Sequence, residues 1–191
     1  MEKPSHAPAQ LAERFGLPTS AFASEAAQRP RGHVVQREGE PCDRAYLLVK
    51  GTARAYALDP DGGEHVTWFA FEGDLLASVE ALTGAPARDT VELTEPSALV
   101  AIDVAALRPR LGTDPAATAL ALALVTEHAQ ALDDEVRALR ALSAAERYAL
   151  LLDREPDLLQ RVRLQDVASY LGVARETLSR IRGEHARSGR L

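Results

Sequence analysis

Short apolar runs separated by glycines fill residues 31–103 and restrict what this part of the chain can fold into. They recur at roughly the 8–12-residue spacing that is typical of strands in an antiparallel sandwich or barrel. The clearest turn between them is Asp59-Pro60-Asp61-Gly62-Gly63, because proline presets one φ and glycine accepts a positive one. The expected strands are His33–Gln36, Ala45–Val49, Ala53–Leu58, Val66–Phe71, Thr90–Leu93 and Ala98–Ile102.

A long helix is expected to follow, beginning at Thr113-Asp114-Pro115. Asp114 can cap the free N–H groups, and Pro115 suits the first helical turn. Apolar residues then recur at alternating intervals of three and four, the heptad pattern of helices that pack in pairs. Leu120 and Leu124 add a second apolar stripe that can face the barrel. We therefore predict a homodimer held by a seam, with packing of the helix on its own barrel as the alternative; the seam comprises Leu122, Val125, Ala129, Leu132, Val136 and Leu139.

The two ends of the chain give further local signals. Residues 1–28 are rich in alanine and predict a short helix followed by a connector. Ser143 and Glu146 have the spacing of a capping box, so a helix is expected from there to about Asp153, with another turn at Leu158–Arg161. The resulting division is a barrel domain over 1–112, a dimerisation helix over 113–142 and a second domain over 143–191.

Residues 164–182 have the pattern of two helices that cross steeply through a tight turn. Ala168 permits a close approach, and Gly172, four residues later, tolerates a left-handed turn. Apolar residues at positions 167, 171, 173, 178 and 181 would fill the crossing. This pattern predicts a helix-turn-helix, whose second helix enters the major groove of DNA.

The second of these helices carries side chains suited to reading bases. Arg175 and Ser179, like Glu176 and Arg180, are four residues apart and lie on or near one face. Arginine can bond O6 and N7 of guanine, and glutamate can accept from N4 of cytosine. The alternative is an exposed helix in which Glu176 pairs with Arg180.

Charge and composition agree with an anionic partner at the C-terminal end only. The chain of 191 residues has a net charge of −6, but residues 1–160 carry −10 and residues 161–191 carry +4. Its one cysteine, Cys42, excludes an intramolecular disulfide and an iron–sulfur cluster built on cysteines. The absence of a long apolar run and of a signal-peptide pattern predicts a cytoplasmic protein that does not enter a membrane.

With its barrel, long helix and helix-turn-helix, the sequence resembles the Crp/Fnr family of bacterial transcription regulators. The family's pattern G-[apolar]-[ST]-R-E-T-[apolar]-[SG]-R matches residues 172–180 except at Ala174, where a capping hydroxyl is lost. The resemblance implies that Arg175, Glu176 and Arg180 read the bases of a G-T-G-A-like half-site, and that Gln165 and Thr177 lie near phosphates. The family's winged hairpin would begin near residues 189–191, so its backbone contacts are expected to be missing.

The resemblance implies an α+β protein with an N-terminal double-stranded β-helix, or jelly roll, of the cyclic-nucleotide-binding kind. In cyclic-nucleotide-binding members a Gly-Glu pair holds the ribose, and an arginine about ten residues later holds the cyclic phosphate. Here Ala77-Ser78 stands in place of Gly-Glu, and Asp89 adds a negative charge beside Arg88. Both changes oppose cyclic AMP, so Arg88 and Ser78 remain weak candidates for an effector pocket, and Arg88 could instead pair with Asp89 or Glu92.

The function expected is that of a homodimeric regulator that binds double-stranded DNA at a palindromic operator, with RNA polymerase as a further candidate partner. The sequence identifies no effector. The alternative is a cupin-like binding protein or enzyme whose helical domain binds protein. Its metal site would need an H-x-H pair, and none of the five histidines is so spaced. We identify no catalytic and no metal-binding residues.

Overall fold

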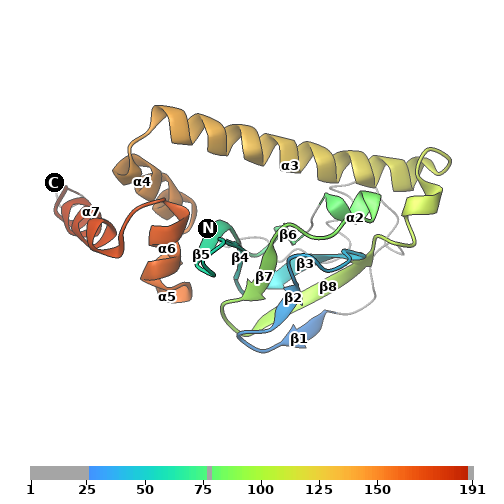
Figure 1. Ribbon diagram of the computed structural model, residues 1–191, viewed down its shortest axis with the longest axis horizontal. Helices are drawn as coiled ribbons and strands as arrows, with labels where there is room; N and C mark the ends of the chain where they lie inside the picture. The colour runs from blue at the N-terminus through green and yellow to red at the C-terminus, as the bar shows by residue number, and fades with distance from the viewer. Residues whose placement is uncertain (1–25, 77–78, 189–191) are drawn as a thin grey trace.

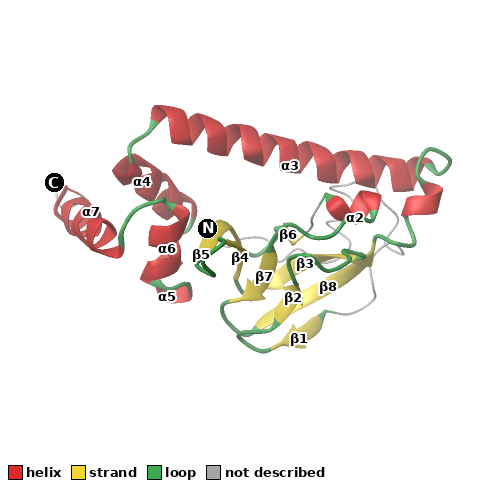
Figure 2. Ribbon diagram, in the orientation of Figure 1, coloured by secondary structure: helices red, strands yellow, loops and turns green. Residues whose placement is uncertain are grey.

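The computed structural model describes residues 26–76 and 79–188, which form a β-sandwich, a long helix and a group of four helices (Figure 1). The strands make two antiparallel sheets of four, as Figure 2 shows in yellow. The first sheet has the order β1-β8-β3-β6 and comprises Ala27–Arg29, Ser97–Asp103, Arg44–Lys50 and Leu75–Leu76. The second has the order β2-β7-β4-β5 and comprises Val34–Gln36, Thr90–Leu93, Ala53–Leu58 and Glu64–Ala70.

All six strands expected from the apolar runs are present, two of them with the predicted bounds and the others with ends that shift by one or two residues. The turn at Asp59 also forms: Gly62 has a φ of +82°, and the Asp59 carboxylate accepts the N–H groups of Asp61 and Gly63. Strands β1 and β6 were not predicted. The prediction of a connector up to residue 28 was wrong at its end, where β1 lies. The residues Ala-Gln-Arg form this strand only by pairing with β8, which the local sequence does not show. The rest of the expected N-terminal helix, at residues 1–25, lies outside the described residues, as do residues 77–78 and 189–191.

Three apolar clusters hold these layers together. Small and branched side chains such as Ala53, Ala55, Leu93 and Leu99 fill the space between the sheets. A second cluster lies on the outer face of the first sheet, where it is covered by the short helix α2 (Glu80–Thr83) and by α3 (Pro115–Ala141). The short 3-10 helix Arg108–Arg110 leads into α3. The predicted start of α3 is confirmed, because the Asp114 carboxylate accepts the N–H groups of Ala116 and Ala117.

Helix α3 connects the sandwich to the four C-terminal helices (Figure 1). Leu120 and Leu124 are buried against the sandwich as expected, and the remainder of the helix continues toward α4. Among the described residues, no helix combines the length and hydropathy that crossing a membrane requires.

We call residues 143–188 the helical unit. It comprises α4 (Ala144–Arg154), α5 (Leu158–Arg161), α6 (Leu164–Tyr170) and α7 (Arg175–Ser188). The predicted capping box of Ser143 and Glu146 is present at the start of α4. The core of the unit includes Tyr148, Leu158 and Leu171, and it is continuous with Val66 and Phe69 of β5. The first helix of the predicted motif, α6, therefore packs on the edge strand of the second sheet.

Candidate nucleic-acid interface

Helices α6 and α7 form the helix-turn-helix predicted from the sequence. Gly172 has a φ of +67°, the left-handed conformation that glycine adopts without strain. The turn is closed by two hydrogen bonds, from the N–H of Gly172 to the carbonyl of Ser169 and from the N–H of Val173 to that of Ala168, each 3.0 Å long. Ala168, Leu178 and Ile181 are buried at the crossing. These contacts fix the direction in which α7 leaves the turn.

A guanidinium from α4 supports the same turn. The Nη2 of Arg147 donates to the Leu171 carbonyl at 2.9 Å, at the C-terminal end of α6. A cation is favoured there because the last carbonyls of a helix carry partial negative charge. This arginine was not singled out by the sequence, since no local pattern links α4 to the turn.

The side chains predicted to read bases lie on the exposed surface of α7. Arg175, Glu176, Ser179 and Arg180 are exposed, whereas Leu178 on the opposite side is fully buried. Thr177 is half-buried, and Gln165 is exposed in the first turn of α6. The helix thus separates a face that holds the core from a face that can enter a groove.

Arg180 does not pair with Glu176. Its Nη1 instead contacts the Glu184 carboxylate at 3.1 Å, one turn further along α7. Both side chains are more than half exposed, and a surface pair of this kind contributes about 0–1 kcal/mol to stability. Arg180 can therefore leave this partner for a base at little cost.

The apolar seam of α3 faces away from the sandwich. Leu122, Leu132 and Leu139 expose 66%, 53% and 54% of their surface, and Val125 and Val136 are also exposed. Ala129 is exposed between them. An apolar stripe of this length on the outside of a helix marks a surface that binds another protein surface.

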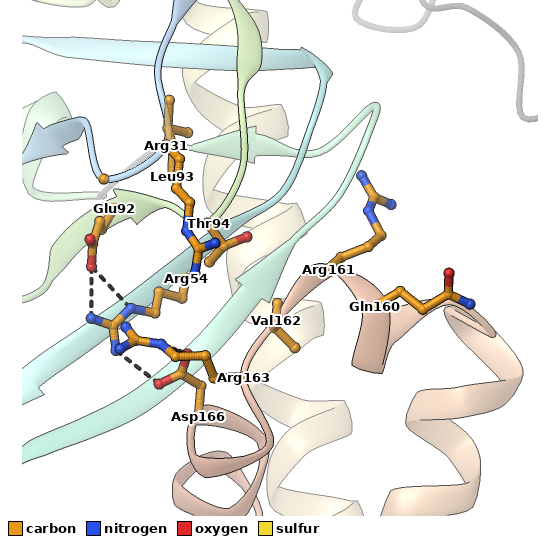
Figure 3. A pocket seen from close by; sticks show the side chains of 11 residues that line it. Arg31, Arg54, Glu92, Leu93, Thr94, Gln160, Arg161, Val162, Arg163 and Asp166 are labelled. Carbon is orange, nitrogen blue, oxygen red and sulfur yellow. Dashed lines mark hydrogen bonds and ion pairs between the residues drawn. The ribbon is translucent and has the colours of Figure 1, made fainter.

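A buried arginine joins the helical unit to the sandwich. Arg54 lies in β4 with only 4% of its side chain exposed, and its Nη1 contacts Asp166 of α6 at 3.1 Å. Figure 3 shows its guanidinium between Glu92 and Asp166, and Glu64 is a third partner at 2.7 Å. Burial alone would lower the pKa of Arg54, but the hydrogen bonds to Glu92 and Glu64, together with the negative charges of Asp166 and Glu92, outweigh it and the pKa is raised. The residue therefore stays charged.

A second arginine makes the reciprocal connection. Arg161, at the end of α5, reaches back to the sandwich and contacts Glu72 and Glu95, with distances of 3.0 Å from Nη1 to Glu72 and 2.8 Å from Nε to Glu95. Burial raises the pKa of Glu72, but the hydrogen bonds from Arg161 and from the backbone, together with the charge of Arg161, outweigh this effect, and the pKa falls below its usual value. Arg54 and Arg161 line one cavity of about 240 Å³ at the junction.

Two further residues of α6 complete the junction. Ser169 accepts the N–H of Val66 at 2.9 Å and so satisfies a backbone donor on the edge strand β5. Tyr170 packs edge-on against Phe69, and its hydroxyl donates to Glu135 of α3 at 2.7 Å. The pKa of Tyr170 is raised by burial and by this carboxylate. Asp166, Ser169 and Tyr170 thus turn one face of α6 into a contact surface that the sequence did not reveal.

The sandwich does not present the expected phosphate-binding arginine to its interior. The side chain of Arg88 is 85% exposed and pairs with Glu80 of α2 at 2.8 Å, so neither Asp89 nor Glu92 is its partner, contrary to the alternative considered for it. Asp89 accepts hydrogen bonds from Trp68 and Thr67, and burial raises its pKa. The residues present therefore do not fit a cyclic phosphate in the way the resemblance implies. Ser78 lies outside the described residues.

Comparisons with known proteins agree with this architecture. Residues 27–114 match the family model described as the cyclic nucleotide-binding domain. The chain is 22% identical over 171 residues to a CRP-like cAMP-activated global transcriptional regulator of Mycobacterium tuberculosis, covering 84% of this chain and 76% of that protein. It is 25% identical over 172 residues to the fumarate and nitrate reduction regulatory protein of Escherichia coli, covering 84% and 68%.

Solved structures share the fold over most of the chain. FixK2 from Bradyrhizobium japonicum superposes with a TM-score of 0.71 at 23% identity, covering 86% of each chain. The c-di-GMP-responsive global regulator CLP of Xanthomonas campestris superposes with a TM-score of 0.65 at 20% identity, covering 95% of this chain and 93% of that one. Sandwich, long helix and helix-turn-helix occur in the same order, and together these similarities support a transcription regulator of the Crp/Fnr family.

Proposed function

We propose that the chain acts as a homodimer that reads an inverted repeat, with one recognition helix α7 in each of two successive major grooves. The observation that carries this proposal is the division of α7 into a buried face, with Leu178 and Ile181, and an exposed face, with Arg175, Glu176 and Arg180. Helix-turn-helix dimers place their recognition helices about 34 Å apart, one turn of DNA. The exposed seam of α3 supplies the surface for the dimer.

In this proposal Arg175 and Arg180 bond guanines, and Glu176 accepts from a cytosine of the opposite strand. Gln165 and Thr177 contact phosphates, and Ser179 lies between the readers. Because α7 leaves its arginines exposed and only weakly paired, they are available without unfolding any part of the helical unit.

The sandwich is not proposed to bind cyclic AMP in the family's usual manner. Support comes from Arg88, which lies at the surface in a pair with Glu80, and from Asp89, whose carboxylate adds a negative charge next to it. The proposal assigns no catalysis to the chain and places it in the cytoplasm, where bacterial DNA lies.

The test is a selection of binding sites from random duplexes, carried out with the wild type and with Arg180→Ala. The wild type should enrich an inverted repeat. Arg180→Ala should lose the preference at one guanine in each half-site and bind more weakly by ~1–3 kcal/mol per half-site. Gln165→Ala, at a proposed phosphate contact, should weaken all sequences about equally.

Arg187→Ala is the matched control, because Arg187 lies on the same helix about two turns beyond Arg180 and its Nε donates to the Gly183 carbonyl. Its selected sequence should equal that of the wild type. If Arg180→Ala also enriches that same sequence with unchanged base preferences, Arg180 is not a base reader.

A further inference from the structure

Two arginines, one from each domain, form ion pairs between the helical unit and the sandwich. Arg54 belongs to the sandwich and reaches Asp166 of the helical unit, while Arg161 belongs to the helical unit and reaches Glu72 and Glu95 of the sandwich. We call these five residues the two-arginine lock. Figure 3 shows Arg54 and Arg161 in the wall of the same cavity, where the two domains meet.

The lock can hold the helical unit in one orientation because three of its charged side chains are largely buried. The side chains of Arg54, Asp166 and Arg161 expose 4%, 8% and 19% of their surface. A charge in such a place favours a partner at a defined position, and opening the junction would separate Asp166 from Arg54 and would take both sandwich carboxylates from Arg161. Two contacts, one from an arginine of each domain to carboxylates of the other, restrict rotation as well as translation of the helical unit.

The short peptide connection between α3 and α4 would not by itself fix the orientation of the helical unit. Only Leu142 and Ser143 connect the end of α3 at Ala141 to the start of α4 at Ala144. The contact of Tyr170 with Glu135 then ties α6 to α3 itself. The position of α7 relative to the dimerisation helix is therefore set by side-chain contacts, and among the charged side chains that make them Arg54 is the most deeply buried.

The locked arrangement leaves the recognition surface open. Arg175, Glu176 and Arg180 are exposed while Asp166 and Tyr170 of the preceding helix are held against the sandwich and α3. Docking therefore does not cover α7. It fixes where α7 points.

We propose that the two-arginine lock determines which half-site spacing the dimer accepts, so that Arg54 and Glu72, in the sandwich and far along the chain from α7, are determinants of operator choice. This inference rests on the proposed function. One added base pair moves a half-site by about 3.4 Å and turns it by roughly 35°, since a helical turn holds 10–10.5 base pairs. A locked unit cannot follow that movement, whereas an unlocked unit on a two-residue connection can.

The experiment compares the wild type with Asp166→Asn/Arg161→Met on a series of duplexes. The series contains the selected inverted repeat with its centre shortened or lengthened by one and two base pairs, together with a duplex that holds a single half-site. In the double variant Arg54 keeps Glu64 and Glu92, so the sandwich retains its internal pairs. The methionine preserves most of the apolar stem of Arg161.

The wild type should lose about tenfold in affinity, or more, for each base pair of altered spacing, because a rigid pair of helices must give up one half-site. The double variant should lose less than about threefold for one base pair and should bind the single half-site within about twofold of the wild type. Arg163→Met is the matched control, since it removes an arginine from the same segment whose ion pair, with Asp166 at 3.2 Å, lies within the helical unit and leaves the contact between Arg54 and Asp166 in place. It should keep the steep wild-type profile.

A second variant, Glu72→Gln/Glu95→Gln, opens the Arg161 half of the lock from the sandwich side and leaves the core of the helical unit intact. It should flatten the profile in the same way, and it replaces the first variant if that one fails to fold. The inference is overturned if either folded variant shows the wild-type spacing profile, or if the wild type itself tolerates every spacing. A failure of the proposed function would be seen earlier and differently, as no preference of the wild type for the repeat over a scrambled duplex.

Discussion

Replacing Leu132 and Val136 with aspartate should separate the proposed dimer into monomers. These two side chains lie at the centre of the seam and expose 53% and 42% of their surface in a single chain. Full burial of a leucine or valine side chain contributes roughly 1.5–3 kcal/mol, and about half of each surface remains to be buried, so each contributes about 1 kcal/mol to association. Four such side chains in the dimer give about 4 kcal/mol, a factor of roughly a thousand in the dissociation constant.

The introduced carboxylates add to this loss, because each would be buried without a partner at a cost of several kcal/mol. Sedimentation velocity at micromolar concentrations should therefore give a monomer for Leu132→Asp/Val136→Asp and a dimer for the wild type. Leu150→Asp is the control: Leu150 is also 53% exposed, but it lies on α4 outside the seam. A folded double variant that sediments as a dimer would refute the assignment of the seam, as would a monomeric Leu150→Asp.

Three further predictions concern stability. Gly172→Ala should lower the melting temperature, because the left-handed φ of +67° costs a residue with a side chain roughly 1–2 kcal/mol. No neighbouring atom would clash with the added methyl group, so the backbone conformation is the cause of the loss. An unchanged melting curve would contradict this. Millimolar cyclic AMP should leave the melting temperature unchanged, whereas a ligand at 100 times its Kd would add roughly 2.7 kcal/mol and reveal a functional pocket. Burial raises the pKa of Asp89 above 3.8, so the folded protein holds this proton more tightly than the unfolded chain, and the contribution of Asp89 to stability is lost as pH rises through the raised pKa. Asp89→Asn should remove that part of the decline and melt higher at pH 7; a lower melting temperature there would argue against it.

Features that depend on neighbouring residues could be predicted from the sequence. The cap at Asp114, the capping box of Ser143 and the turn at Gly172 each rest on groups within a few positions of one another, and all three are present. The seam of α3 also follows from spacing alone, since helical periodicity decides which side chains share a face.

Features that depend on distant pairing could not be predicted. Strand β1 exists because Ala27–Arg29 pairs with β8, some 70 positions later, and its own residues carry no alternation. Arg54 and Asp166 are 112 positions apart, and no periodicity connects them. One signal was available: Arg54 is a charged residue inside the otherwise apolar run Ala53–Leu58, and a charge at a buried strand position requires a partner from another element. The sequence could not say which element that would be.

The central claim, that two copies of this chain read an inverted repeat in DNA, is tested most directly by measuring the mass and affinity of the complex on one duplex over a range of salt. With the selected repeat, the account predicts two chains per duplex and a preference of roughly a thousandfold or more over a scrambled duplex of equal length at physiological salt. Affinity for both duplexes should fall steeply as salt rises, since phosphate contacts release counterions. One chain per duplex, or equal affinity for the repeat and the scrambled duplex at every salt concentration, would contradict it.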